Sequence, residues 1–306
     1  MREKAILFGK FHTLAGIITE PDTAPGENMP VVILSNAGLI HRIGPNRIYV
    51  KLARELAQQG FTVLRFDLSG IGDSVTRPDN MPVEEFTIDD MLQAMNYMAE
   101  TFGARKFVLG GHCAGAYHSI RTAVQDARVS GVVMINPDGG EAEWKEYDKK
   151  RKLAQYYENY YGKKTLLDPQ RWRRFFTAQV SYRSVLKNVF KNVIWNRLSG
   201  MFFRIRQRLN TPKPQPTAAD EKLFTVEAIV RKLPELTSQV LLVYSENATS
   251  LERVQISMGK ELKRLQADGK LQLSVIPGAD HIFSPLASQT CLFQTVAQWM
   301  QANYQE

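Results

Sequence analysis

The sequence predicts an α/β fold in which helices cover both faces of a mostly parallel central sheet. Three observations lead to this prediction. Short apolar runs alternate with longer amphipathic stretches over residues 1–140 and again over residues 236–306. Residues 141–235 lose this alternation and become aromatic and basic. A chain of 306 residues is long enough for one core domain, 1–140 with 236–306, carrying an inserted helical cap at 141–235.

The expected strands are apolar runs bounded by turn-forming residues. The run VVILS at 31–35 is continuously apolar until its last residue, which is typical of a strand buried on both faces. The loop before it is rich in Pro, Gly, Asp and Asn. We expect strands at residues 3–8, 11–19, 31–35, 61–67, 106–111, 130–137, 239–245 and 271–277.

The expected helices carry apolar residues at helical spacing. Ile48, Leu52 and Leu56 recur every four positions, and Gly60 supplies a stop signal. The stretch that begins VEEFTIDD has acidic residues early, where the helix dipole favours them. We expect helices at residues 47–60, 83–103, 250–267 and 285–304, and one directly after residue 113.

The strand at 106–111 runs into a Gly-x-Cys-x-Gly motif, which reads GHCAG at 111–115. Small residues are needed around a sharp strand-to-helix turn, because the turn is strained and the next helix packs close. Such a turn raises its central side chain above the carboxyl edge of the sheet. A helix N-terminus favours a Cys113 thiolate, and the Ala114 N–H would point at the reacting oxygen. The motif predicts a nucleophile; a small buried Cys in a glycine-rich helix start is the alternative.

A nucleophile of this kind needs a base, and in this architecture the base follows the last strand. His281 stands on the loop after the strand at 271–277. A lone loop His is usually only a surface residue, but here a Gly-x-Cys-x-Gly motif precedes it in the expected strand order. We expect His281 to lie within hydrogen-bond reach of Cys113, about 3–4 Å between heavy atoms.

With these motifs the chain resembles the α/β-hydrolase superfamily over nearly its whole length. The resemblance implies that SNAG at 35–38 is the oxyanion loop, with the Ala37 N–H as a second donor beside Ala114. FDLSGIGDS at 66–74 resembles the family's Asp-x-x-Gly-x-Gly-x-Ser loop, which we interpret as structural. Most members use Ser, whereas Cys occurs in dienelactone hydrolases and polyhydroxyalkanoate synthases.

A narrower resemblance concerns two longer stretches. NAGLIHRIGPNRIYVKLARELAQQGFTVLRFDLSGIGDS and LLDPQRWRRFF are similar to a bacterial subgroup often associated with exosortase and exopolysaccharide gene clusters. The substrates of that subgroup are poorly defined, so this resemblance adds little chemistry.

The acid that would orient His281 is the least clear member of the set. The family usually places Asp where this chain has Ala248. Glu246, two residues earlier, is the first candidate, and Asp138, after the strand at 130–137, is the second. The third possibility is that no acid is present, because a Cys–His pair can work without a strong third member.

Further polar residues flank the same loops. His41 and Arg42 follow the oxyanion loop and could contact an anionic substrate, and His112 precedes the nucleophile. A solvated loop or a hydrogen-bonded scaffold is the alternative for these residues. We interpret His118 as helix packing and Cys291 as an inert core thiol.

The net charge of +8 is concentrated in the insertion. Residues 141–215 hold 18 Lys and Arg against 6 Asp and Glu. Four interpretations are open: a nucleic-acid surface, a peripheral membrane surface, the roof of an acyl tunnel facing an anionic carrier such as coenzyme A or an acyl-carrier protein, and a solvated helical surface. No nucleic-acid motif is recognised, so nucleic acid is not expected.

The expected activity is hydrolysis of an ester or thioester through a Cys113 acyl-enzyme, with His281 as general base. The alternatives are an acyltransferase that passes the acyl group to an alcohol or amine, and a non-catalytic ligand-binding protein on the same scaffold. No metal or redox cofactor is implied. No signal peptide or apolar run of membrane-spanning length is visible, and the two cysteines form no disulfide framework. A cytoplasmic location, with possible membrane contact, is therefore the expectation.

Overall fold

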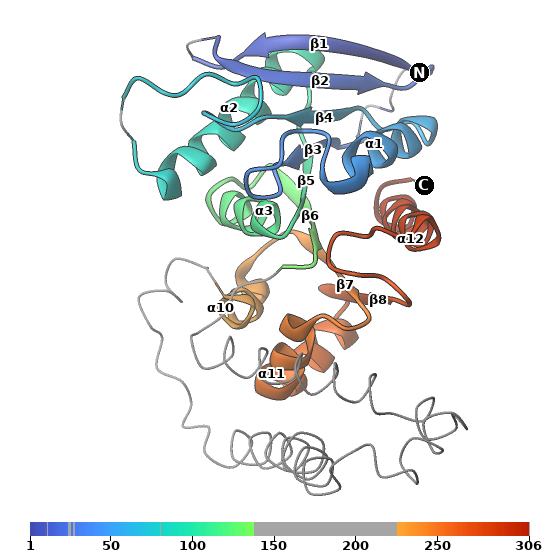
Figure 1. The fold of residues 1–306 in the computed structure, drawn as a ribbon. Coiled ribbons are helices and arrows are strands. Elements are labelled where there is room, and N and C mark those ends of the chain that lie inside the picture. Colours follow the sequence, from blue (N-terminus) through green and yellow to red (C-terminus); the bar gives the residue numbers. More distant parts are fainter. Residues whose placement is uncertain (11, 24–25, 27, 80, 138–224, 306) are drawn as a thin grey trace, which may run out of the picture. The chain divides into compact units, whose positions relative to one another are not determined.

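Eight strands form one sheet at the centre of the described residues (Figure 1). The computed structural model describes residues 1–10, 12–23, 26, 28–79, 81–137 and 225–305, which all belong to one compact unit. The strands are β1 (Arg2–Phe8), β2 (Leu14–Glu20), β3 (Val31–Ser35), β4 (Val63–Phe66), β5 (Phe107–His112), β6 (Val129–Ile135), β7 (Gln239–Ser245) and β8 (Leu271–Ile276).

The strand order is β1-β2-β4-β3-β5-β6-β7-β8. β2 pairs antiparallel with both β1 and β4, and the pairs from β4 to β8 are parallel. The parallel strands therefore end at one common edge of the sheet, where the loops that follow them meet.

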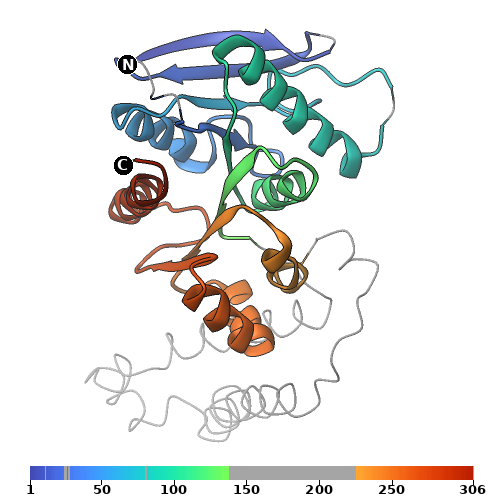
Figure 2. The same cartoon turned by 180° about the vertical axis from the view of Figure 1, so that it is seen from behind.

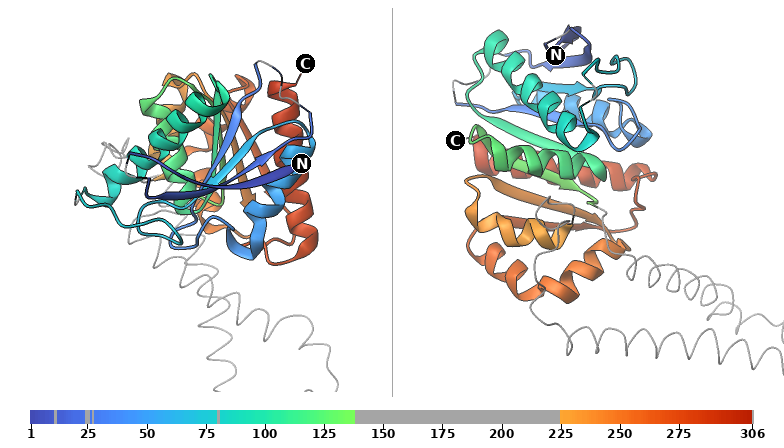
Figure 3. Two further views of the ribbon diagram at one scale, coloured as in Figure 1. Left: turned by 90° about the horizontal axis from the view of Figure 1, so that it is seen from above. Right: turned by 90° about the vertical axis from the view of Figure 1, so that its left-hand side faces the viewer.

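Helices cover both faces of this sheet (Figures 2 and 3). They are α1 (Ile48–Gln58), α2 (Val83–Phe102), α3 (Ala114–Gln125), α10 (Val226–Lys232), α11 (Thr249–Ala267) and α12 (Leu286–Tyr304), with short 3₁₀ turns η1 (Pro45–Arg47) and η3 (Leu233–Glu235). α2, α3, α10 and α11 contribute to the hydrophobic core on one face, and α1 and α12 to the core on the other.

The central strand β5 shows why the chain folds this way. Phe107 and Leu109 pack into one core and Val108 into the other, because successive side chains of a strand point to opposite faces. All six β5 residues are buried, which agrees with a strand that is apolar or glycine on both faces up to its last residue, His112. The predicted α/β fold is confirmed, and most element boundaries agree within two residues.

The predicted strand at 130–137 is too long. β6 ends at Ile135, because Asn136 has a φ of 43° and leaves the extended conformation, although its N–H still donates to the carbonyl of Val243, the partner of Ile135 in β7. The predicted strand at 11–19 likewise begins only at Leu14.

The described end of the predicted cap packs with the core. α10 is capped by the Thr225 side chain, which accepts from the Ala228 N–H at 3.1 Å, and its apolar residues join the same core as α11. Residues 141–224 of the cap lie outside the described residues. Among the helices that are described, none combines the length and apolar character needed to cross a membrane.

Candidate active site

Cys113 occupies the turn between β5 and α3 in a strained backbone conformation. Its φ of 53° and ψ of −114° lie outside the regions that residues with a side chain prefer. The Cys113 N–H donates to the carbonyl of Ile135 at 2.9 Å, which ties the turn to the end of β6. Strain held in place by its surroundings is typical of a functional turn.

The two glycines of the motif are required by close packing. A Cβ on Gly111 would lie 2.3 Å from the Gly115 carbonyl carbon, and a Cβ on Gly115 would lie 2.6 Å from the Asn36 carbonyl oxygen. Both distances are far below van der Waals contact, and the opposing atoms belong to backbone that cannot rotate away. The sequence interpretation of a crowded strand-to-helix turn is therefore confirmed.

A buried tyrosine lies beneath the turn. Tyr49, on α1, is fully buried, and its hydroxyl oxygen accepts a hydrogen bond from the His112 N–H at 2.7 Å. Burial raises the pKa of Tyr49, and a negative charge on Cys113 raises it further, so the phenol stays protonated. Its position as the first aromatic residue of α1 gave no sign of this contact in the sequence.

His281 follows β8, and its backbone is held against the end of β5. Its carbonyl accepts from His112 Nε2 at 2.6 Å and from Asn136 Nδ2 at 2.8 Å. The His112 and His281 rings also pack together, with centroids 4.8 Å apart, while the His281 residue itself is exposed. His281 thus contacts the residue that immediately precedes Cys113, and its pairing with the Cys113 sulfur stays a prediction.

His112 is part of the scaffold. Only 2% of the residue is exposed, and burial lowers its pKa to about 4, with a further lowering from the nearby His281 and an opposing effect of its bond to the His281 carbonyl. It is therefore neutral at pH 7. The alternative of a hydrogen-bonded scaffold, and not direct substrate contact, is favoured for this residue.

Of the two acid candidates, the structure describes Glu246 and not Asp138. The Glu246 carboxylate accepts from the backbone N–H of Gly278 at 2.9 Å, which ties the loop after β7 to the turn after β8. Within the described part of the chain, the His281 imidazole makes no hydrogen bond or ion pair with a carboxylate. Asp138 lies outside the described residues.

The predicted oxyanion donors lie at the same edge of the sheet. Ala114 is the first residue of α3, so its N–H has no acceptor within the helix. Ala37 follows the buried Asn36, whose side chain donates to the Ile40 carbonyl at 2.9 Å and accepts from Leu68 N–H at 2.6 Å. Asn36 thereby fixes the loop on which Ala37 stands.

Arg42 is engaged by carboxylates. Its guanidinium pairs with the fully buried Asp67 and with the exposed Asp73, and its backbone N–H donates to Asp67 at 2.5 Å. These ion pairs raise the pKa of Arg42 although its partial burial acts in the opposite direction. The contacts favour a scaffold role over binding an anionic substrate, and they agree with the structural interpretation of the loop at 66–74. His41 is exposed on the same loop.

Tyr49 and Asn136 are the site residues that sequence reasoning missed. Asn136 could have been predicted from the sequence, since a polar residue that directly follows a buried strand at the carboxyl edge of the sheet often belongs to the functional site. The half-buried His118, whose Nδ1 lies 3.3 Å from Ser35 Oγ, agrees with the expected helix packing.

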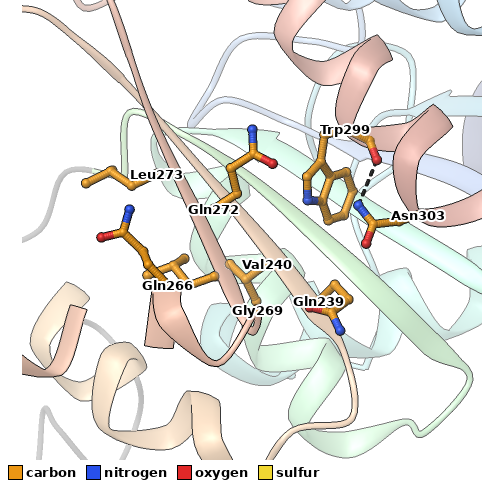
Figure 4. A pocket seen from close by; sticks show the side chains of 9 residues that line it. Gln239, Val240, Gln266, Gly269, Gln272, Leu273, Trp299 and Asn303 are labelled. Atoms are coloured by element: carbon orange, nitrogen blue, oxygen red, sulfur yellow. Dashed lines mark hydrogen bonds between the residues drawn. The ribbon is translucent and has the colours of Figure 1, made fainter. Parts of the chain in front are cut away.

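A cavity of about 330 Å³ lies at the opposite edge of the sheet (Figure 4). Its lining comes from the first residues of β7 and β8, from Gln266 at the end of α11 and Gly269 after it, and from Trp299 and Asn303 of α12. Because Cys113 follows the carboxyl end of β5, this cavity is separate from the candidate site. Among the described residues, no cluster of His, Cys, Asp and Glu is suited to hold a metal ion.

Known proteins resemble this chain in sequence and in fold. The family described as "alpha/beta hydrolase fold" matches residues 32–285. Esterase EstD of Thermotoga maritima is 32% identical over 127 residues, which are 40% of this chain and 30% of the esterase; the match thus spans less than a third of that protein.

Solved structures share the fold at low sequence identity. Proline iminopeptidase of Mycobacterium smegmatis has a TM-score of 0.55 at 16% identity and covers 98% of each chain. Dienelactone hydrolase of Anabaena variabilis has a TM-score of 0.54 at 15% identity, covering 99% of this chain and 98% of its own. A thermophilic esterase of Thermogutta terrifontis has a TM-score of 0.53 at 18% identity, covering 99% of this chain and 100% of its own.

Proposed function

Because the chain belongs to the alpha/beta hydrolase fold family, we propose that it hydrolyses a carboxylic ester or thioester through Cys113. The observation that carries the proposal is the backbone of Cys113, held at φ 53° and ψ −114° between β5 and the N-terminus of α3. Two glycines that cannot carry a Cβ maintain this turn. The similarity to an esterase over part of the chain supports ester chemistry.

In the proposed reaction, the Cys113 sulfur attacks the substrate carbonyl as a thiolate. The N-terminus of α3 stabilises the thiolate, and the N–H groups of Ala37 and Ala114 stabilise the negative oxygen of the tetrahedral intermediate. The C–O or C–S bond then breaks, and protonated His281 gives its proton to the leaving group. In the second half, neutral His281 takes a proton from water, which attacks the acyl-enzyme. The acyl C–S bond then breaks, the acid leaves, and Cys113 returns to the thiolate beside protonated His281.

We propose Glu246 as the acid that supports His281. Glu246 is bound to the backbone of the His281 loop through Gly278, so its negative charge lies on that loop. It would stabilise the imidazolium electrostatically even without a direct bond to the ring. Asp138 is the alternative, and a Cys–His pair without an acid is the third possibility.

The proposed substrate is a small or carrier-bound acyl compound. The basic segment at 141–215 suits an anionic carrier such as coenzyme A or an acyl-carrier protein, or an anionic membrane surface. We propose a cytoplasmic enzyme, because the chain has only two cysteines, far apart in sequence.

The test is acylation with an activated ester, p-nitrophenyl butyrate, followed by intact-mass measurement. We expect a single butyryl adduct on the native protein and its loss in C113A. The matched control is C291A, which removes the other thiol and should keep the adduct. An adduct that survives in C113A contradicts Cys113 as the nucleophile. A folded native protein that forms no adduct and releases no p-nitrophenol beyond the C113A background contradicts the proposal and favours a non-catalytic binding protein.

Acyl transfer is the second candidate, because a thioester intermediate reacts with amines and alcohols as well as with water. Adding a primary alcohol to the acylated enzyme separates the two activities. A transferase gives ester at the expense of free acid at millimolar acceptor. A hydrolase gives free acid regardless of the acceptor.

A further inference from the structure

The backbone carbonyl of His281 receives two side-chain hydrogen bonds. His112 Nε2 donates at 2.6 Å and Asn136 Nδ2 at 2.8 Å, from the ends of two neighbouring parallel strands. A carbonyl oxygen has two lone pairs, so this acceptor is fully used. The loop after β8 is thus attached to β5 and β6 at the residue that carries the proposed base.

Both donors are joined to the Cys113 turn. His112 is the residue before Cys113, and Asn136 is the residue after Ile135, whose carbonyl accepts from the Cys113 N–H at 2.9 Å. Asn136 is itself fixed, because its Oδ1 accepts from the Ser245 N–H at 2.7 Å and its N–H donates to the Val243 carbonyl at 2.8 Å. A short chain of bonds therefore sets where His281 stands relative to Cys113.

The bond to the His281 carbonyl determines the tautomer of His112. A carbonyl can only accept, so the proton of neutral His112 is on Nε2. Nδ1 carries none and, among the described residues, has no hydrogen-bond partner although it is buried. A proton added to Nδ1 would create a buried donor without an acceptor, which agrees with the lowered pKa of His112.

We propose that His112 is a positioning residue, which holds the backbone of His281 through its Nε2–H so that the His281 imidazole faces the Cys113 sulfur. This inference rests on the proposed Cys113–His281 pair and deepens it. His112 touches no substrate in this scheme. It acts on the pair through the loop that it holds and through the contact of its ring with the His281 ring.

The test is the rate of Cys113 alkylation by iodoacetamide as a function of pH, followed by intact mass in a C291A background. A properly placed imidazolium lowers the thiol pKa. H112L removes the donor and should raise the apparent thiol pKa by about one unit, which lowers the thiolate fraction about tenfold at pH values below the native thiol pKa. H112Q keeps an N–H donor at similar reach and should restore most of the native profile.

His118 supplies the matched control. It is a half-buried His whose pKa is also lowered to about 4, but its ring contacts Ser35 and not the His281 loop. H118L should reduce thermal stability as H112L does and leave the alkylation profile unchanged. Where H112L fails to fold, H112N takes its place, because its shorter amide does not reach the His281 carbonyl.

The outcomes separate the positioning role from the proposed function. If H281A leaves the alkylation profile as it is in the native protein, the Cys113–His281 pair itself is wrong. If H281A raises the thiol pKa and folded H112L or H112N does not, the positioning role of His112 is refuted. Equal effects of H112L and H118L would show that only general destabilisation is being measured.

Discussion

Close packing at Gly115 helps to hold Cys113 in its backbone conformation. The turn keeps Cys113 at a positive φ, and such strain costs about 1–3 kcal/mol and persists only where the surroundings enforce it. Gly115 provides part of that enforcement, because α3 approaches the backbone of Ser35 and Asn36 at this residue. The same approach brings Ala114 and the loop of Ala37 to one edge of the sheet.

Gly115→Ala tests this packing. Its Cβ would lie 2.6 Å from the Asn36 carbonyl oxygen, so either α3 or the loop of Ala37 must move. We expect a loss of about 1–3 kcal/mol in the free energy of unfolding and slower acylation of Cys113. Gly259→Ala in α11 is the control, since a Cβ there meets nothing within 4 Å and should be neutral or stabilising. Unchanged acylation in Gly115→Ala would contradict the close-packing argument.

At the scale of elements, the loops after β3 and β4 act as one unit. The buried Asp67 after β4 accepts from Arg42 and from the Asp73 N–H at 3.0 Å, and Asn36 after β3 donates to it at 3.4 Å. Ser74 Oγ closes the loop by donating to the Asp67 carbonyl at 2.6 Å. The Asp-x-x-Gly-x-Gly-x-Ser loop therefore supports the loop that carries Ala37.

The Arg42→Ala variant distinguishes a structural role of Arg42 from a role in substrate binding. Removing the guanidinium leaves the buried Asp67 without its main counter-charge, and we expect a loss of about 3 kcal/mol in stability by denaturant unfolding. The double variant R42A/D67N should recover part of that loss. A substrate-binding role predicts the reverse: stability close to native, a higher KM for anionic substrates, and no recovery in the double variant.

For the whole molecule, acid sensitivity follows from two histidines that the fold keeps neutral. Burial lowers the pKa of His112 and of His118 from 6.5 to about 4. The unfolded chain therefore binds more protons than the folded one between these values. Stability is complete above pH 6.5 and is lost as the pH falls toward 4.

The free energy of unfolding should therefore fall measurably as the pH is lowered. Between pH 7 and pH 5, each His should contribute a loss of about 2 kcal/mol to the free energy of unfolding measured with urea. H118Q should remove about half of the combined loss, because the amide does not titrate. A native slope that H118Q leaves unchanged would show that His118 is already protonated or exposed in the folded protein.

Local patterns in the sequence were sufficient to predict the sheet, the helices and the turn at Cys113. Apolar periodicity depends on neighbours a few residues away, and the spacing of two glycines around Cys113 reflects a contact within one strand-turn-helix unit. The position of His281 after the last strand was also predicted, because it follows from chain order, whereas its role as base stays a prediction. Tyr49 was missed, since no local pattern marks a phenol that meets a backbone N–H 63 positions later.

What the sequence by itself determined is therefore the alternation of strands and helices and the presence of a Cys and a His at the ends of the right strands. Only the tertiary structure decided how these residues are held: that His112 and Asn136 bind the His281 carbonyl, that Arg42 is committed to Asp67, and that Glu246 binds the Gly278 backbone. The physical reason is that hydrogen-bond partners far apart in the chain are chosen by the geometry of the folded sheet edge, which no local spacing encodes.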